Sequence, residues 1–229
     1  MAGGDIFRVA SLEVKRAVVG RVRILLWGCC WAALAIPRDC IGSRSWELFR
    51  SGDGFYNYAP CAVEEEFVHH FWWCQNTDPG QIVDCIYYRR FEVRGGRWTP
   101  RQLALSPGEP GQWDSVHVCD PSVVRGSFHH RGEQFSWLLS YLGTDDPACR
   151  HNQVGLALAH DPAGPWRRFE GNPIIAGSAR TWGAGQPSVV SLDHRGRLLL
   201  FYTKQEEDLS THTWVREVDA SDLDRPSVG

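Results

Sequence analysis

A short strand-like run that contains an X-Pro dipeptide occurs three times along the chain, and it constrains the fold more than any other feature. The copies are YAPCAV at 58–63, DPSVV at 120–124 and QPSVV at 186–190, and their prolines lie 61 and 66 residues apart. Each proline is followed by small and β-branched residues, which is typical of a buried strand. Self-similarity at so long a period indicates a repeat architecture.

The composition favours short strands and tight turns over helices. The 229 residues include 11 Trp but one Met, together with 23 Gly and 13 Pro. Turn signals such as Gly95-Gly96 and 193–196 separate further apolar runs within each repeat. Four short antiparallel strands form one propeller blade. We therefore predict an all-β chain built from blades.

The first 35 residues have the features of a secretory signal peptide. Basic residues up to Arg23 precede an apolar run at 24–35 that is too short to span a bilayer and ends in a small-x-small cleavage site. LWGC at 26–29 is an alternative lipoprotein site, and a buried helix of the mature fold is a third reading. Removal of residues 1–35 predicts a secreted or periplasmic protein with no membrane span.

The rest of the chain divides into a lead-in segment at 36–57 and a partial propeller domain at 58–229. We place the blades at about 58–112, 113–180 and 181–229. Two blades and three further strands do not close a ring, and an open sheet edge favours pairing. The chain is therefore either a fragment or a protein that completes its ring by self-association.

The net charge and the spacing of the cysteines limit which partners and cofactors the chain is expected to bind. The formal net charge is −3, and residues 1–35 carry five basic but two acidic residues, so the remainder is more acidic and has no basic run. Nucleic acid is excluded as a partner because phosphate binding demands clustered Lys and Arg. Cys61, Cys74 and Cys85 fall on successive predicted strands, which leaves both a cross-strand disulfide and free thiols open. No Cys or His spacing suits a metal, and we predict no cofactor.

Several motifs resemble those of five-bladed β-propeller glycosidases, the family 43 arabinanases and xylosidases and their relatives. NQVGLALAHDPAGPW at 152–166 is similar to their Asp-x-x-Gly-Pro-Trp turn, and the three X-Pro runs are similar to their inner strands. The likeness covers roughly residues 55–226. It implies a propeller of the five-bladed glycosidase type with about three four-stranded blades present, apparently truncated. It also implies hydrolysis of a glycosidic bond of a polysaccharide or oligosaccharide in the channel.

In that family the inner strands of three blades each present a carboxylate at the channel mouth, where they supply an acid, a base and a residue that tunes the acid. Asp120 matches the tuning Asp of the Asp-Pro-Ser strand. Gln186 stands where the general-acid Glu is expected, and Ala59 stands where the general-base Asp is expected. Two of the three carboxylates are therefore absent from the matched positions.

Three explanations of this absence stay open. The register is shifted, so that Asp53, Asp84 or Asp114 supplies a carboxyl group; or further blades hold the missing residues; or the site only binds sugar. We take Asp114 as the catalytic partner of Asp120, and we interpret Asp53 and Asp84 as turn residues.

The candidate substrate-binding residues are His117, which lies between the two aspartates and is suited to polarise a hydroxyl group, and four residues near the inner strands: Trp113, Trp182, Gln186 and Tyr58. Aromatic faces at such positions stack on sugar rings. The predicted function is a family 43-like glycosidase that acts on carbohydrate. The alternatives are a non-catalytic carbohydrate-binding propeller and an inactive fragment.

Overall fold

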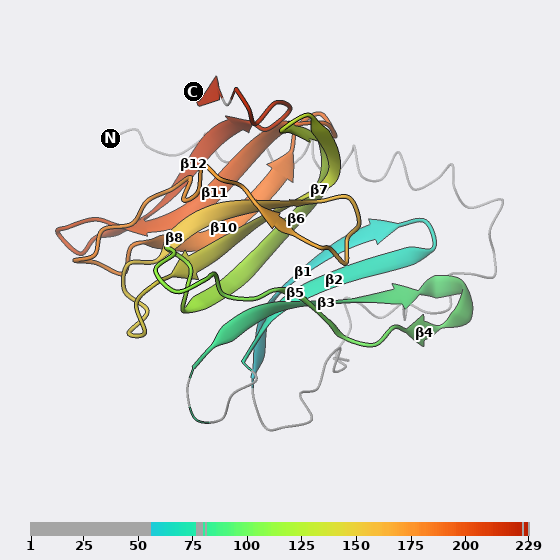
Figure 1. Ribbon diagram of the computed structural model, residues 1–229, viewed down its shortest axis with the longest axis horizontal. Helices are drawn as coiled ribbons and strands as arrows, with labels where there is room; N and C mark the ends of the chain where they lie inside the picture. Colours follow the sequence, from blue (N-terminus) through green and yellow to red (C-terminus); the bar gives the residue numbers. More distant parts are fainter. Residues whose placement is uncertain (1–55, 77–79, 81, 226, 229) are drawn as a thin grey trace, which may run out of the picture. The chain divides into compact units, whose positions relative to one another are not determined.

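The computed structural model of the chain describes residues 56–76, 80, 82–225 and 227–228. The predictions of a signal peptide, of most of the lead-in segment and of a role for Asp53 lie outside these residues. The described residues form strands and one short 3-10 helix, η2 (Val93–Gly95), which confirms the all-β prediction (Figure 1). No helix among them is long and apolar enough to cross a membrane.

Three antiparallel sheets follow one another along the chain, each a simple meander. The first sheet contains β1 (Asn57–Glu65), β2 (Val68–Asn76), β3 (Asp84–Glu92) and β4 (Arg97–Trp98) in that order, with β5 (Gln102–Leu105) also paired to β3. The second contains β6 (His117–His130), β7 (Glu133–Thr144), β8 (Gln153–Ala159) and β9 (Arg167–Arg168). The third contains β10 (Ala184–Ser191), β11 (Arg197–Gln205), β12 (Thr211–Asp219) and β13 (Ser227–Val228), so it has one strand more than the sequence suggested.

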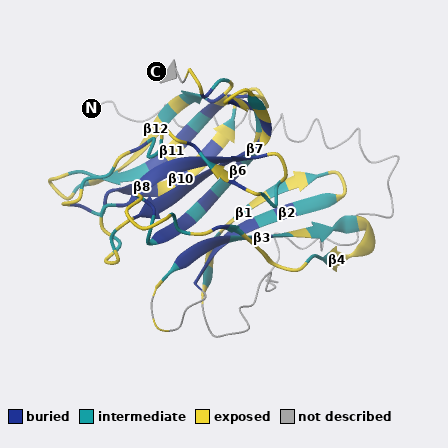
Figure 2. Ribbon diagram, in the orientation of Figure 1, coloured by how far each residue is buried: buried dark blue, intermediate teal, exposed yellow. Residues whose placement is uncertain are grey.

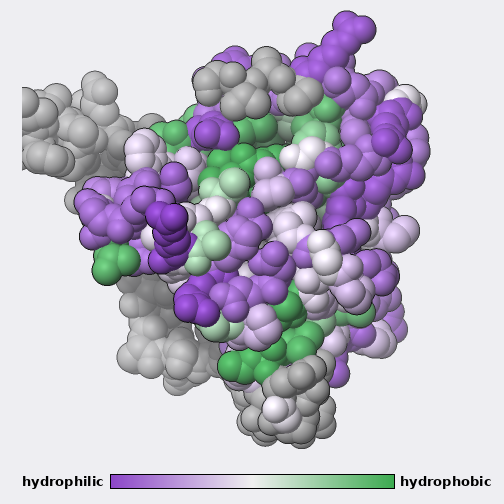
Figure 3. Space-filling model, turned by 60° about the vertical axis from the view of Figure 1, so that its left-hand side comes forward, coloured by the Kyte–Doolittle hydropathy of each residue, from purple (hydrophilic) through white to green (hydrophobic). Residues whose placement is uncertain are grey.

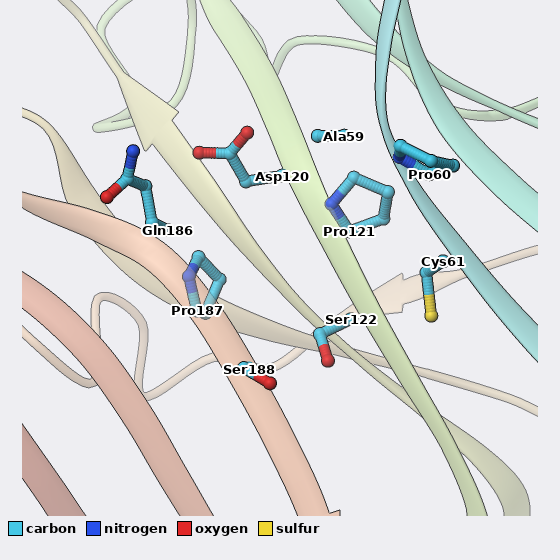
Figure 4. A pocket seen from close by; sticks show the side chains of 9 residues that line it. All are labelled: Ala59, Pro60, Cys61, Asp120, Pro121, Ser122, Gln186, Pro187 and Ser188. Atoms are coloured by element: carbon cyan, nitrogen blue, oxygen red, sulfur yellow. The ribbon is translucent and has the colours of Figure 1, made fainter. Parts of the chain in front are cut away.

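The three X-Pro dipeptides occupy the same place in the three sheets. Pro60, Pro121 and Pro187 lie in β1, β6 and β10, the first strand of each sheet, and β6 contacts both of the other two strands. Figure 4 shows the three prolines in a row on neighbouring strands. The predicted equivalence of the three runs is therefore confirmed.

The same hydrogen bond joins each first strand to the next. The backbone N–H of Val123 donates to Sγ of Cys61 at 3.3 Å, and the backbone N–H of Val189 donates to Oγ of Ser122 at 2.9 Å. Cys61 and Ser122 each directly follow the repeated proline. These bonds fix the spacing of the strands because each satisfies a backbone donor that the sheet itself leaves unpaired.

The core lies in two layers, one on each face of the second sheet. Large aromatic side chains fill the layer between the first and second sheets, among them Trp72, Tyr88 and Trp137. Leucine and phenylalanine side chains, such as Leu156, fill the layer toward the third sheet. Because it is covered on both faces, β8 is buried at every position and reads as a continuous apolar run (Figure 2).

One face of the molecule is largely polar, and the thiols of the described residues are unpaired. Figure 3 shows hydrophilic residues over much of the visible face, with smaller hydrophobic areas between them. Apolar exposure is marked on β12, where Trp214 and Val215 are 46% and 54% exposed. The five cysteines among the described residues, Cys61, Cys74, Cys85, Cys119 and Cys149, are free thiols, so no disulfide joins the strands considered above.

Candidate functional site

Each first strand is interrupted by an irregularity at its X-Pro dipeptide. The pairing register of β1, β6 and β10 shifts at this point. The residues before the prolines, Ala59, Asp120 and Gln186, have φ angles of 47°, 51° and 51°. A left-handed conformation costs a non-glycine residue about 1–2 kcal/mol. Bulges and backbone strain of this kind cluster beside functional sites, where they redirect a side chain.

The redirected side chains meet at two hollows. One, of about 440 Å³, runs along the three prolines and the residues that follow them; the other, of about 400 Å³, lies at the starts of the inner strands and is called the mouth cavity below. Ala59, Asp120 and Gln186 line both. In Figure 4 these three side chains lie on one side of the row of prolines, and Cys61, Ser122 and Ser188 lie on the other.

The mouth cavity brings together most of the residues that the sequence suggested. Its lining includes five of the seven candidates: Tyr58, His117, Asp120, Trp182 and Gln186. A hollow of this size is in the usual range for small-ligand sites. The two remaining candidates, Asp114 and Trp113, do not line it.

Asp114 lies in the protein interior and is held by structural contacts. It is fully buried, and its Oδ2 accepts hydrogen bonds from Tyr141 Oη at 2.9 Å and from Arg168 Nε at 2.7 Å. A carboxylate so enclosed joins β7 and β9 to the loop before β6. This arrangement corrects the expectation that Asp114 is a catalytic residue.

Trp113 is likewise a packing residue. Its ring lies against two glycines, since a Cβ atom built on Gly143 or on Gly155 would lie 2.6 Å from it. It also packs on Tyr141, with ring centroids 5.5 Å apart. The expectation of a sugar-stacking role is corrected for the same reason: the ring fills a groove that only glycine leaves open.

Asp84 takes the place in the cavity that the sequence assigned to Asp114. It is the first residue of β3, is 6% exposed and lines the mouth cavity, so its interpretation as a surface turn residue is wrong. Its Oδ2 accepts a hydrogen bond from Tyr58 Oη at 2.8 Å. The available signal was the position of this Asp immediately before a buried run. Asn152, directly before β8, also lines the cavity.

The environment of Asp120 shifts its ionisation. The pKa of this carboxyl is raised from its usual 3.8 to about 6, chiefly by burial; a hydrogen bond from the backbone N–H of Gln186 opposes the rise, and the charge of Asp84 adds to it. A carboxyl group that titrates near neutral pH can both give and accept a proton at working pH. Asp120 is thus the residue of the cavity best suited to proton transfer.

Other polar side chains of the cavity already have partners. The Nδ2 of Asn152 donates to the carbonyl oxygens of Cys149 and Trp182, both at 2.8 Å, and the backbone N–H of Trp182 donates to Oε1 of Gln205 at 2.8 Å. Thr144 Oγ1 donates to the carbonyl of Arg150 at 2.9 Å. These bonds hold the half-buried Trp182 at the cavity wall.

One group of side chains within the described ranges has ligand atoms close enough together to hold a cation. His129, Asp222 and Asp224 offer atoms within 4.8 Å of one another. They lie near the end of β6, away from the residues of the mouth cavity. Asp224 already accepts hydrogen bonds from His130 and from the backbone of Arg131. None of these residues takes part in the site described here.

The fold and the placement of the cavity define the class. The described residues form three antiparallel sheets, one of five strands and two of four, which are arranged as blades of a β-propeller, with a polar cavity where the first strands begin. No protein-family model and no curated protein matches the sequence.

Solved structures show what the chain is similar to. A family 117 glycoside hydrolase produced by the marine bacterium Zobellia galactanivorans matches with a TM-score of 0.57 and 14% identity, over 79% of this chain and 57% of that one. A thermostable family-43 glycoside hydrolase matches with a TM-score of 0.53 and 18% identity, over 79% and 59%. An endo-1,4-beta-xylanase from Bacteroides thetaiotaomicron matches with a TM-score of 0.52 and 13% identity, over 76% and 57%.

These likenesses establish the fold that the motifs predicted. The identities are low, so the chemistry of this chain has to be argued from its own residues. The chain spans less than two thirds of the length of each of the three structures.

Proposed function

We propose that the mouth cavity binds a carbohydrate and that the protein hydrolyses a glycosidic bond there, with Asp120 as the residue that protonates the leaving oxygen. The observation that carries this proposal is the state of Asp120: a carboxyl group with a pKa of about 6, redirected by a bulge into a cavity of about 400 Å³. Glycoside hydrolysis needs a carboxylic acid whose pKa is raised in this way.

The surroundings of Asp120 suit a sugar. Trp182 offers an aromatic side chain at the cavity wall, and Gln186 contributes an amide that both donates and accepts hydrogen bonds. The glycosidase fold of the structural neighbours supports the same reading. One of them is named an endo-1,4-beta-xylanase, and the sequence motifs resemble those of arabinanases and xylosidases, so aryl β-xylosides and α-arabinofuranosides are reasonable first substrates. A secreted or periplasmic location and self-association stay predictions.

The test is a matched pair of variants assayed on these aryl glycosides. Asp120→Asn keeps the shape of the side chain but removes its proton, so we expect kcat/KM to fall by about 10² or more. Glu66→Gln is the control, because this exposed carboxylate lies in the turn between β1 and β2, at the other end of β1 from the cavity. Unchanged turnover in Asp120→Asn would remove Asp120 from the mechanism.

A specific observation favours a second function, carbohydrate binding without hydrolysis. The positions equivalent to Asp120 in the other two sheets hold Ala59 and Gln186, and neither can titrate. Measurable affinity for an oligosaccharide, combined with no release of reducing sugar by the wild-type protein, would support this alternative and exclude hydrolysis.

A further inference from the structure

Two buried polar side chains of the mouth cavity, those of Asp84 and His117, have no part in the proton transfer proposed for Asp120. Asp84 begins β3 and His117 begins β6, so they come from adjacent sheets, and both line the cavity. They are 6% and 2% exposed. Buried polar groups are normally hydrogen-bonded on all sides, and each exception needs an explanation.

Hydrogen bonds to one side of each group fix its orientation. Tyr58 Oη donates to Oδ2 of Asp84 at 2.8 Å. The backbone N–H of Asp84 donates to Nδ1 of His117 at 3.1 Å. Because Nδ1 accepts this bond, the neutral imidazole carries its proton on Nε2. Burial lowers the pKa of His117, which keeps the ring neutral at physiological pH.

The other side of each group has no protein partner. Oδ1 of Asp84 and Nε2 of His117 are both buried, and neither makes a hydrogen bond within the described part of the chain. One is an acceptor and the other is a donor. A hydroxyl group or a water molecule could satisfy either atom, because it can accept from Nε2 of His117 or donate to Oδ1 of Asp84.

Asp84 offers a carboxylate in the cavity where the residue before Pro60 offers none. Ala59 cannot act as a base, but Tyr58 next to it holds Asp84, and the charge of Asp84 contributes to the raised pKa of Asp120. Asp84 and Asp120 both line the mouth cavity, and their carboxyl groups differ in environment. Cleavage of a glycosidic bond by direct attack of water requires such a pair.

We propose, resting on the hydrolytic function proposed above, that Asp84 is the general base of the reaction and that His117 orients the attacking water. The water oxygen forms a bond to the anomeric carbon while Asp84 Oδ1 takes its proton. The glycosidic C–O bond breaks, and the leaving oxygen takes the proton of Asp120. Asp84 then releases its proton to solvent and Asp120 takes one up, which restores the starting state, so no further reactant is needed.

The test compares Asp84→Ala with Asp120→Ala on two substrates of the sugar that the wild type hydrolyses. One substrate has a poor alcohol leaving group and the other has a 2,4-dinitrophenyl group, which leaves without protonation. Asp120→Ala should recover at least tenfold in relative kcat on the activated substrate. Asp84→Ala should be at least tenfold slower than the wild type on both, and it should recover with added formate or azide, which replace the missing carboxylate.

Two further readouts separate a catalytic from a merely structural role. Direct attack of water inverts the anomeric configuration, and ¹H NMR of the first-formed product records this. His117→Gln, which keeps a donor, should retain more activity than His117→Leu, whereas the exposed His160→Leu should match the wild type. If Asp84→Ala does not fold, the product configuration and the His117 pair still decide the case.

The outcomes distinguish the two proposals. Retained turnover in Asp84→Ala, or retention of configuration by the wild type, overturns the assignment of Asp84 and leaves the proposed hydrolysis intact. Sugar binding by a wild type that does not turn over overturns hydrolysis and this assignment together, and absence of both binding and turnover removes the carbohydrate site itself.

Discussion

Replacement of Asp114 by Asn tests whether this residue supports the fold or the reaction. Asp114 is fully buried, and it accepts hydrogen bonds from Arg168 at 2.7 Å and from Tyr141 at 2.9 Å. Removal of one partner of a buried ion pair costs about 3–5 kcal/mol, because the other charge is left without compensation. The side chain of Arg168 is 28% exposed, so water offsets part of this loss. We expect a destabilisation of about 2–4 kcal/mol.

A change of this size is easy to measure. In a domain of this size each kcal/mol shifts Tm by roughly 2–4 °C, so Tm should fall by roughly 5–15 °C. Glu133→Gln is the matched control: Glu133 pairs with the adjacent Arg167 at 2.8 Å, but the two side chains are 43% and 46% exposed. A surface pair contributes less than about 1 kcal/mol.

Thermal unfolding followed by circular dichroism gives Tm, and turnover is assayed well below the transition of the variant. The expected result is a large loss of stability with kcat within about twofold of the wild type. If Asp114→Asn melts within about 2 °C of the wild type, or loses its turnover while fully folded, the structural role argued here for Asp114 is refuted.

Three further predictions concern the glycine groove, the bonds between the first strands and the raised pKa. Gly143→Ala should destabilise by about 1–3 kcal/mol in urea titrations, because the added Cβ would lie 2.6 Å from the Trp113 ring; an unchanged midpoint would show that the ring moves freely. Ser122→Ala should cost about 1–2 kcal/mol because the Val189 N–H loses its acceptor, and Ser122→Cys should recover part of this loss. The pKa of Asp120 is higher in the folded than in the unfolded state. Its contribution to the free energy of unfolding is therefore present below about pH 4 and is lost as the pH rises through about 6. Asp120→Asn should raise the free energy of unfolding by about 1–3 kcal/mol at pH 8 relative to the wild type, but not at pH 4.

The blades were predictable because the signals that specify them are local. The X-Pro runs, their β-branched residues and the turns that follow depend only on neighbours in sequence, and they placed Pro60, Pro121 and Pro187 on equivalent strands. The short fourth strand β13 was missed because a two-residue strand has no periodicity. Five of the seven candidate site residues line one cavity because the bulged strands bring their starting ends together.

The exchange of roles between Asp84 and Asp114 shows where local pattern fails. Both precede apolar strand residues, and by sequence alone Asp114 is the better placed of the two because it lies near Asp120. The buried position of Asp114 depends on its ion pair with Arg168, which is 54 residues away and belongs to β9, the outer strand of the second sheet. Asp84 lines the cavity at the start of β3, where the side chain of Tyr58, 26 residues earlier and on β1, donates a hydrogen bond to it across β2.

By itself, the sequence determined an all-β chain of three repeated units with one titratable residue, Asp120, at the repeated position before proline. Only the tertiary structure decided which second carboxyl group accompanies it, that His117 turns Nε2 away from its backbone partner, and that Trp113 is packed between strands. The physical reason is that strand period and turn chemistry are properties of adjacent residues, whereas the burial and hydrogen-bond partners of a side chain depend on how separate sheets pack together.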